Sequence, residues 1–474
     1  MITSKKNIQK YLEHKIFKTI SEVADSLKVD TYIVGGFVRD IILNKELKQD
    51  IDIMCVGSGI ELAKKIQKKI NSKEKIKIFK RYGTAMINYD NLNIEFVGSR
   101  KESYSKNSRN PNIESGSFLD DMLRRDFTIN TLAVELNKSN YGKLIDTFNG
   151  LKDLERKIII TPTDPNKTFS DDPLRMIRAV RFASQLKFDI DKETEKSILK
   201  NSSRLKIVSP ERISDEINKI LMTDEPSIGF KYLERMGLLK YIIPELIELK
   251  GIEEIEGQTH KDNFYHTLEV LDNISKNTQN LWLRWAALLH DIGKAPTKKF
   301  NIKIGWTFYG HEYVGSKMVK KIFQKLSLPL NDKLKYVQRI VMMSSRPIII
   351  SEEIVTDSAV RRLIYDAGDT IDDLLIMCEA DITTKNQKKF IEYQNNFKIV
   401  RNKIKDVEER DNIRNFQPPI TGKIIMDYFK IKPSKEIGII KEKIKNSILD
   451  GEIKNDYDDA FELMKKVGNS LGLK

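Results

Sequence analysis

Residues 32–56 constrain the fold of this chain more than any other stretch. The apolar residues 32–34 predict a short strand that runs into Gly35 and Gly36, and the apolar spacing of residues 37–43 predicts a helix directly after this turn. Two glycines before a helix N-terminus let the backbone come close to a phosphate group. A Gly-Gly turn by itself is more often only a turn, so its meaning depends on the residues that follow.

Two aspartates follow within the same stretch. Residues 50–56 predict a second strand, on which Asp50 and Asp52 alternate with two isoleucines. Alternate side chains of a strand point the same way, so the two carboxylates share one face. Paired carboxylates suit a hard divalent cation such as Mg²⁺, which binds one or two protein carboxylates together with substrate phosphates. The glycine turn and the paired aspartates, this close together, favour metal-dependent nucleotide chemistry.

The composition bounds the fold and the partners. A chain of 474 residues is long enough for several domains. It carries 82 lysines and arginines against 68 acidic residues, a net charge of +14, which favours a polyanionic partner, although a lysine-rich solvated surface has the same balance. The only cysteines, Cys55 and Cys378, exclude a disulfide framework and a four-cysteine zinc site. Because the sequence has no apolar signal core and no membrane-length apolar run, we expect a soluble cytoplasmic protein without a membrane partner.

The pattern of apolar residues changes near residue 150. Before it, strand-like and helix-like segments alternate. The expected elements are a helix at residues 59–70 and strands at residues 75–79, 84–89 and 93–97. The polar, Ser- and Asn-rich residues 98–117 predict a mobile loop. Beyond residue 150, apolar residues recur at helical spacing, so the sequence predicts an α+β fold with a small mixed-sheet head and an all-helical remainder.

Residues 120–130 contain two adjacent arginines, Arg124 and Arg125, flanked by acidic residues. In isolation, this pattern is typical of a solvated helix start. After a glycine turn and paired aspartates, it favours a clamp for a triphosphate, because guanidinium forks match phosphate oxygens. We expect the carboxylate of Asp126 to fix the orientation of these arginines.

A further motif lies at residues 171–183. Asp172 suits the N-terminal cap of a helix, along which Arg175, Arg178 and Arg181 recur every three residues. An ordinary amphipathic helix with a basic solvent face has the same pattern. The functional alternative is that Asp172 and Arg175 read a nucleotide base, since a carboxylate accepts from an exocyclic amino group and a guanidinium donates to a ring acceptor. Such a pair would accept cytosine and adenine and would reject uracil and guanine.

The histidines give a second, independent signal. The chain has five, and four of them fall within about fifty residues. His290 and Asp291 follow an apolar helical segment, with His266 upstream and with His311 and Asp381 downstream. A single histidine is more often structural than a ligand. The ordered set favours a metal cage for phosphoester hydrolysis, built by imidazoles and carboxylates from separate helices.

In this order, the head motifs resemble those of the class II nucleotidyltransferases, the family of the CCA-adding enzymes and bacterial poly(A) polymerases. The resemblance covers about residues 25–235. Its motifs are Gly35-Gly36-x-Val38-Arg39-Asp40 with Asp50-x-Asp52, Arg124-Arg125-Asp126, DTFNG at residues 146–150, Asp171-Asp172-x-x-Arg175, and SPERISDE at residues 209–216. Asp171 departs from the family pattern, which has the longer glutamate at that position.

The resemblance implies a CCA tRNA nucleotidyltransferase, which adds C, C and A to the 3′ end of tRNA from CTP and ATP. Asp50 and Asp52 would be its catalytic residues and would bind two Mg²⁺ ions, with Glu95 as a weaker candidate for a third carboxylate. The implied nucleotide-binding residues are Gly35, Gly36, Arg39, Arg125, Asp126, Asn130, Asp172, Arg175, Arg178 and Arg181. The implied partner is tRNA, bound through its acceptor stem and 3′ end.

The histidine set resembles the HD-domain metal phosphohydrolases. By that resemblance, His266, His290, Asp291 and Asp381 occupy the ligand positions for a divalent metal of unspecified identity, and His311 is an additional ligand or a phosphate contact. Some CCA-adding enzymes carry this domain, which in that group hydrolyses 2′,3′-cyclic phosphates, nucleotides or phosphate monoesters. The resemblance therefore implies a second, phosphohydrolase activity.

The two resemblances divide the chain into four parts. These are a nucleotidyltransferase head at residues 1–150, a helical neck and body at 151–250, an HD domain at 251–390 and a helical tail at 391–474. A poly(A) polymerase, or a specialised CC-adding or A-adding enzyme, has the same head and stays an alternative. A rival of another class is an HD phosphohydrolase whose degenerate head only binds RNA. The intact pair of Asp50 and Asp52 argues against this rival.

Overall fold

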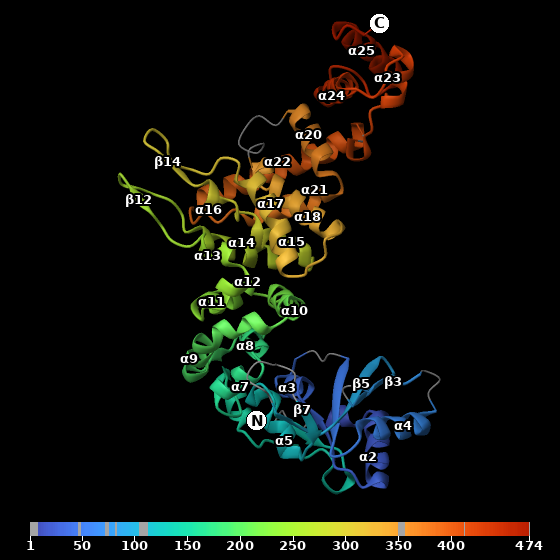
Figure 1. Cartoon of the computed structure of the whole chain (residues 1–474), viewed down its shortest axis with the longest axis vertical. Coiled ribbons are helices and arrows are strands. Elements are labelled where there is room, and N and C mark those ends of the chain that lie inside the picture. The colour runs from blue at the N-terminus through green and yellow to red at the C-terminus, as the bar shows by residue number, and fades with distance from the viewer. Residues whose placement is uncertain are drawn as a thin grey trace. The chain divides into compact units, whose positions relative to one another are not determined.

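The chain folds into two compact units, Met1–Pro244 and Glu245–Lys474 (Figure 1). The structure is a computed structural model, and it describes residues 8–45, 49–71, 75–80, 83–103, 112–348, 356–411 and 413–473.

The first unit is built on a mixed seven-stranded sheet with the strand order β3-β4-β5-β2-β1-β8-β9. β2 and β5 pair in parallel, and the other neighbours pair antiparallel. The strands are β1 Thr31–Val34, β2 Asp50–Cys55, β3 Lys77–Phe79, β4 Thr84–Tyr89, β5 Leu92–Gly98, β8 Ala133–Glu135 and β9 Leu144–Ile145. The mixed-sheet head expected from the sequence is confirmed.

The helices of the first unit agree with the sequence pattern around the glycine and aspartate motifs. α3 (Gly36–Ile42) begins within the glycine pair, and α4 (Gly59–Ile70) has the predicted limits. The other helices are α2 Lys15–Leu27, α5 Phe118–Leu123, α6 Gly150–Arg156, α7 Pro165–Asp171, α8 Leu174–Leu186, α9 Lys192–Asn201, α10 Pro210–Leu221, α11 Pro226–Arg235 and α12 Leu239–Ile242. A short parallel pair, β10 Ile158–Ile159 with β11 Asp189–Ile190, was not expected from the sequence.

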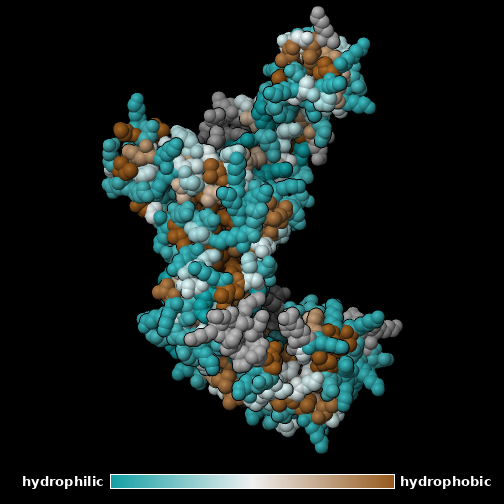
Figure 2. All heavy atoms as spheres, viewed as in Figure 1, coloured by the Kyte–Doolittle hydropathy of each residue, from teal (hydrophilic) through white to brown (hydrophobic). Residues whose placement is uncertain are grey.

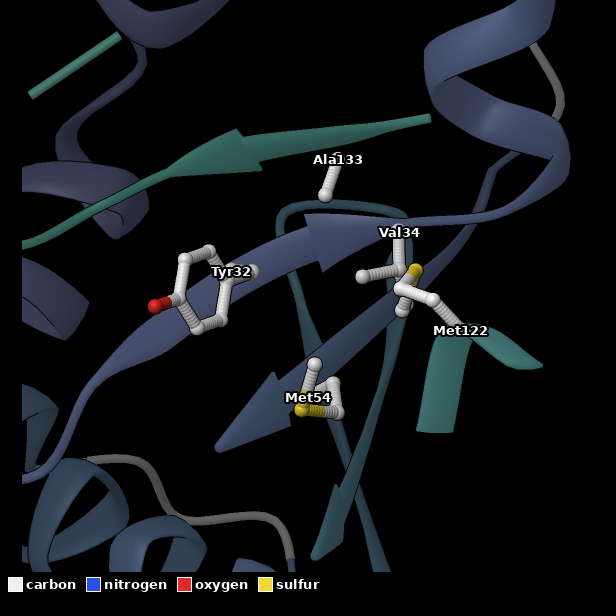
Figure 3. Close-up of a cluster of buried hydrophobic side chains, with 5 residues drawn as sticks. All are labelled: Tyr32, Val34, Met54, Met122 and Ala133. Carbon is white, nitrogen blue, oxygen red and sulfur yellow. The ribbon is translucent and has the colours of Figure 1, made fainter. Parts of the chain in front are cut away.

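The two faces of the sheet have different environments. Ile51 and Ile53 are buried on the face that α4 covers. On the other face, α5 covers one end of the sheet through a buried cluster of Tyr32, Val34, Met54, Met122 and Ala133 (Figure 3). Asp52 pairs in register with Val34, so it shares this second face, and Asp50 lies two residues along on the same face. The alternation expected at the paired aspartates is therefore present, with Asp50 and Asp52 exposed.

The mobile loop predicted at residues 98–117 is wrong at both of its ends. β6 (Arg100–Ser103) and β7 (Asn112–Ser115) form an antiparallel hairpin. This two-stranded ribbon is largely polar, so it lacks the apolar alternation that marks a half-buried strand. The centre of the predicted loop, residues 104–111, lies outside the described residues.

The second unit is largely helical, as the sequence predicts. Its helices are α13 Pro244–Ile247, α14 Asn263–Ser275, α15 Leu281–Leu289, α16 Lys294–Thr297, α17 His311–Lys325, α18 Asp332–Met343, α20 Asp357–Ala367, α21 Ile371–Ala380, α22 Gln387–Asp411, α23 Gly422–Phe429, α24 Lys435–Asp450 and α25 Tyr457–Ser470. Two hairpins that the sequence did not indicate pair β12 Glu254–Ile255 with β13 Gln258–Thr259 and β14 Lys299–Asn301 with β15 Gly305–Thr307. The domain boundary expected between residues 390 and 391 falls inside α22.

The surface view of Figure 2 shows mostly hydrophilic residues, with apolar residues gathered over the β12 and β14 hairpins. Ile302 and Ile304, in the turn between β14 and β15, are 76% and 60% exposed. Among the described residues, no helix is both long and apolar enough to cross a lipid bilayer.

Met122 links α5 to the sheet, and its truncation tests this packing. The side chain is fully buried against Tyr32, Val34 and Met54, so Met122→Ala should destabilise the first unit by about 2–5 kcal/mol, the usual cost of such a cavity. Urea unfolding of the wild type and the variant, followed by far-UV circular dichroism because all three tryptophans lie in the second unit, measures this change. The neighbouring Leu123 is 37% exposed, and Leu123→Ala should cost clearly less; equal losses would contradict the packing described.

Candidate functional sites

One cavity of about 860 Å³ in the first unit collects the predicted residues of the head. All twelve predicted head residues line it: Gly35, Gly36, Arg39, Asp50, Asp52, Arg125, Asp126, Asn130, Asp172, Arg175, Arg178 and Arg181. They come from the turn after β1, from β2 and α3, from the segment after α5, and from α8 and the residue pair before it. Side chains separated by more than a hundred residues therefore face the same space.

The paired carboxylates lie next to a third. Glu95 of β5 pairs in register with Asp52 of β2, and both line the cavity. The Asn93 side-chain amide donates to Asp50 Oδ1 at 2.9 Å. Burial raises the pKa of Asp52, Arg125 lowers it, and the neighbouring carboxylates of Glu95 and Asp50 raise it further, so the net shift is upward. A cation placed between these oxygens would relieve their repulsion, which fits a site for a hard divalent ion.

Gly35 is a position that only glycine fits easily. Its φ is +80°, in the region that favours glycine. A Cβ atom there would lie 3.3 Å from Arg125 Nη1 and 3.5 Å from Asp52 Oδ2. The absent side chain therefore leaves room between the carboxylate strand and Arg125, at the N-terminus of α3.

Asp121, which sequence reasoning did not single out, holds the two adjacent arginines. Its side chain is fully buried; Arg124 donates to Asp121 Oδ1, and Arg125 donates to Asp121 Oδ2 at 3.0 Å. The expectation that Asp126 would orient these arginines is wrong. Asp121 precedes them by three and four residues, so it lies on the same side of the helical turn, and this spacing could have revealed it.

Asp126 instead joins its own segment to two other elements of the cavity wall, α8 and α3. Its carboxylate accepts from Arg178 of α8 at 2.7 Å and from the Asn130 side chain at 3.0 Å, and Asn130 in turn accepts from Arg39 of α3 at 2.8 Å. Burial raises the pKa of Asp126, but Arg178 and the Asn130 hydrogen bond outweigh it and lower the pKa to about 2. Asp126 is therefore a charged, buried junction between α3, the segment after α5, and α8.

The basic face of α8 is held by its neighbours. The sequence places Asp172 at the N-cap of α8, but the N-cap residue is Pro173, which makes no side-chain cap. Asp172 lies one residue earlier, and its Oδ1 accepts from the Leu174 backbone N–H at 3.1 Å. Arg175 donates to the backbone carbonyl of Arg124 at 2.6 Å. Arg181 donates to the buried Glu216 of α10 at 2.6 Å. The stripe of arginines thus lines a cavity and is not a solvated helix face.

The second unit brings the predicted histidine and aspartate residues together. His266 Nε2 lies 2.9 Å from Asp381 Oδ1, and His290 Nε2 lies 3.3 Å from Asp291 Oδ2 and 3.6 Å from Asp381 Oδ1. His311 Nε2 lies 3.7 Å from Asp291 Oδ1, the oxygen on the other side of that carboxylate. Among the described residues, His266, His290 and Asp381 form the group whose ligand atoms all lie within 4.8 Å of one another.

The three imidazoles point their Nε2 atoms into this cluster because their Nδ1 atoms have partners elsewhere. Nδ1 of His290 lies 2.8 Å from the Ala287 carbonyl, Nδ1 of His311 lies 2.9 Å from the Phe308 carbonyl, and Nδ1 of His266 lies 3.0 Å from the Thr383 hydroxyl. A hydrogen bond at Nδ1 orients a ring and leaves Nε2 as a metal ligand. His260 has both ring nitrogens in contacts outside the cluster, so it is structural.

The electrostatics of this cluster favour a cation. Burial alone would lower the pKa of His290, but Asp291 and Asp381 raise it to about 10. Among the described residues, His290 Nε2 and Asp381 Oδ1 are buried without a well-oriented hydrogen bond. Buried polar atoms that converge without such a bond fit a metal ion between them. Lys294 lies 2.6 Å from Asp291 Oδ2 and adds a positive charge that the sequence analysis did not weigh.

Family models match three consecutive parts of the chain. The poly A polymerase head domain matches residues 31–160, and a probable RNA- and SrmB-binding site of polymerase A matches residues 187–249. The HD domain matches residues 263–386, the region that holds the histidine cluster. These matches define the class: a polymerase-type nucleotidyltransferase head joined to an HD domain.

The relatives identify the family more closely. The A-adding tRNA nucleotidyltransferase of Geobacter sulfurreducens is 34% identical over 55% of this chain, but the match spans only 28% of that relative's length. The multifunctional CCA protein of Shewanella frigidimarina is 31% identical over 74% of this chain and 83% of its own length. The CCA-adding enzyme of Thermotoga maritima, solved in complex with tRNA, has the same fold over 98% of both chains, with a TM-score of 0.60 and 23% identity. The chain belongs to the family of the CCA-adding tRNA nucleotidyltransferases.

The buried charge of Asp126 makes the first unit sensitive to acid. Its pKa falls from 3.8 to about 2 on folding, so its contribution to stability is present above pH 4 and is lost as the pH falls through 2. This contribution is on the order of 2 kcal/mol. Urea unfolding at a series of pH values should show a steeper loss of stability in this window for the wild type than for Asp126→Asn, which cannot titrate. Parallel pH profiles would contradict the assignment.

Proposed function

We propose that this protein is a CCA tRNA nucleotidyltransferase, which adds C, C and A to the 3′ end of tRNA from CTP and ATP. The observation that carries the proposal is the single cavity in which paired carboxylates meet a glycine turn and a row of arginines. This combination suits the transfer of a nucleotidyl group from a triphosphate to a hydroxyl. The net charge of +14 suits an RNA partner, which would bind through its acceptor stem and 3′ end.

Asp50 and Asp52 are the proposed catalytic residues, with Glu95 beside them. Held by these carboxylates, two Mg²⁺ ions would activate the attacking hydroxyl and neutralise the leaving pyrophosphate. Asp50 is exposed and Asp52 faces the cavity, so both offer oxygen ligands where a triphosphate would lie. A Mg²⁺ site needs only a few protein ligands, because substrate phosphates and water complete its coordination shell.

The proposed triphosphate and ribose contacts surround the carboxylates. Gly35 and Gly36 present backbone at the start of α3, and Arg125 faces the cavity with one edge of its guanidinium bound to Asp121. Arg39, Asp126, Asn130, Arg178 and Arg181 complete this part of the wall. The donors held by buried acids keep a fixed orientation, so little side-chain entropy is lost when a phosphate binds.

Asp172 and Arg175 are the proposed readers of the base. Asp172 Oδ1 accepts from the Leu174 backbone N–H, and Oδ2, which lies 3.5 Å from Arg212, would accept from the amino group of cytosine or adenine in place of that contact. Arg175, one turn along α8, supplies the donor to the ring acceptor. The shorter Asp171, where the family pattern has glutamate, has its pKa raised chiefly by burial, with Arg175 acting in the opposite direction.

A-adding activity is the second candidate, because the matched relative from Geobacter sulfurreducens is named an A-adding enzyme. A-adding, CC-adding and poly(A) enzymes share the head chemistry, so only the products separate them.

We also propose a cytoplasmic location for the protein. The division of the chain into head, neck and body, HD domain and tail, with boundaries after residues 150, 250 and 390, stays a proposal. Because residue 390 lies inside α22, we move the last boundary to the start of that helix.

For the second unit, we propose a divalent metal site and a phosphohydrolase activity. His266, His290, Asp291 and Asp381 are the proposed ligands, and His311 is a further ligand or a phosphate contact. A metal held there would supply Lewis acidity and an activated water. Lys294, bound to Asp291, is placed to contact a phosphate oxygen.

Nucleotide addition by the head is tested with defined RNAs. Purified protein with Mg²⁺ should extend tRNAs that end before or within CCA, using CTP and then ATP, and should leave a complete CCA end unextended. Asp50→Ala with Asp52→Ala should abolish addition, because the metal loses both ligands, and should spare any phosphohydrolase activity. Gel analysis with each nucleotide supplied alone separates CCA, CC, A and poly(A) products. Addition by the double variant would overturn the metal assignment.

The histidine cluster is tested by the reciprocal change. His290→Ala with Asp291→Ala should lose bound metal, measured by elemental analysis after incubation with Mg²⁺, Mn²⁺, Co²⁺ or Ni²⁺, and should lose phosphoester hydrolysis. Nucleotide addition should persist. The matched control is His260→Ala, a histidine of the same unit outside the cluster, which should keep its metal. Unchanged metal content in the double variant would remove the proposed site.

A further inference from the structure

A second cavity, of about 400 Å³, adjoins the carboxylates on the side away from the glycine turn. It is lined by Phe79, Thr84, Met86, Glu95, Val97, Arg100 and Arg124, and the last four of these also line the larger cavity. In the sheet order, β2 carries Asp50 and Asp52. On one side of β2 lies β1, which leads into the glycine turn, and on the other side lie β5, β4 and β3 in that order. The larger cavity therefore spans β2 and reaches onto β5, and the second cavity continues along the same face to β4 and β3.

The strand register explains how the second cavity forms. Asp52, Glu95 and Met86 pair directly across β2, β5 and β4, and Val97, Thr84 and Phe79 pair across β5, β4 and β3. Both rows lie on the face that holds the catalytic carboxylates. The helix α5 packs through its buried cluster on β1, β2 and β8, and Val97 of β5 lies at the border of that cluster.

The open part of this face is unusual in its chemistry. A solvated face of an antiparallel sheet is ordinarily polar. Here it carries Met86 and Val97, and Phe79 stands at the edge with 44% of its surface exposed. An aromatic ring beside apolar side chains is a platform on which a nucleobase stacks.

Positive charge lies at the same place. Arg124 contacts Asp121 and Glu102, Arg100 contacts Glu102 at 2.8 Å, and Arg125 contacts Asp121. These three guanidinium groups outnumber the two carboxylates that hold them, Glu102 and Asp121. A phosphate group entering between the two cavities would meet Arg100 and Arg124.

We propose that this second cavity binds the 3′-terminal nucleoside of the RNA primer, with its base on Phe79 and Met86 and its hydroxyl directed past Glu95 to Asp50 and Asp52. This inference rests on the proposed nucleotidyl transfer. In that reaction the primer 3′-oxygen forms a bond to the α-phosphorus, the bond to pyrophosphate breaks, and the hydroxyl proton passes to water. The attacking and leaving oxygens lie in line, so the primer approaches from the side opposite the triphosphate.

The topology places the two substrates accordingly. Under the proposed function, the glycine turn and the arginines of α3 and α8 take the triphosphate at the β1 end of the larger cavity, and its continuation over β4 and β3 remains for the primer. The two cavities are continuous, because they share four lining residues: Glu95, Val97, Arg100 and Arg124. One phosphodiester product can therefore span both cavities. The apolar platform matches a base, which has a π-face whatever its identity, so the site suits a primer end that changes after each addition.

The test separates primer binding from nucleotide binding. Phe79→Ala should raise the KM for a tRNA lacking its last nucleotide by about tenfold, as expected for loss of one stacking contact, with the KM for ATP and the kcat within about twofold of wild type. Phe79→Trp, which keeps an aromatic face, should restore the primer KM. The matched control is Ile78→Ala, since Ile78 is on the same edge strand, is 37% exposed and faces the opposite side.

A primer with an abasic 3′-terminal nucleotide completes a double-mutant cycle, in which the Phe79 ring and the primer base are removed separately and together. The wild type should bind it about tenfold more weakly than the normal primer, and Phe79→Ala should add no further loss, because the stacking partner is already absent. An equal loss for both primers, an unchanged primer KM, or a shift in the KM for ATP instead would overturn the inference. If the wild type adds no nucleotide to any primer, the proposed function itself fails, and that outcome is distinct from all of these.

Discussion

Two buried carboxylates, Asp121 and Asp126, determine how the arginines of the head cavity are presented. An unpaired carboxylate in these positions would be costly, so each one binds guanidinium groups: Asp121 those of Arg124 and Arg125, and Asp126 that of Arg178. A guanidinium has five donors, and one bound edge leaves the others for a ligand. Both carboxylates depend on α5 and the segment after it, which Met122 packs onto the sheet, so the hydrophobic core positions the charges of the site.

The two proposed metal sites follow different physical designs. In the head, Asp50 is exposed and the carboxylates line a wide cavity, so substrate oxygens can complete the shell of a hard ion. In the second unit, His290 and Asp291 are 1% and 2% exposed and converge with His266 and Asp381 at close range. Under the proposed function, two imidazoles and two carboxylates there form an enclosed set of mixed nitrogen and oxygen ligands. The two proposed sites therefore differ in both ligand type and enclosure.

Sequence patterns predicted the parts of this structure that depend on short-range geometry. Alternation placed Asp50 and Asp52 on one face, and helical spacing placed the arginines of α8 along one side. Which carboxylate holds which arginine could not be predicted in the same way, because Asp121 and Asp126 flank the pair and their partners depend on how α8 approaches. The hairpins β6–β7, β12–β13 and β14–β15 were missed because short strand pairs outside a core show no apolar alternation.

The proposed base-reading pair, Asp172 and Arg175, depends on the helices and not on the sheet. Asp172 Oδ2 lies 3.5 Å from Arg212 of α10, a partly exposed contact that is worth about 0–1 kcal/mol. A hydrogen bond from a base to a carboxylate is worth about 1.5–3 kcal/mol, so under the proposed function a base displaces Arg212. The same helix holds Arg181 through the buried Glu216. A shift of α10 against α8 would therefore alter Asp172 and Arg181 together, and under the proposed function it would alter base selection.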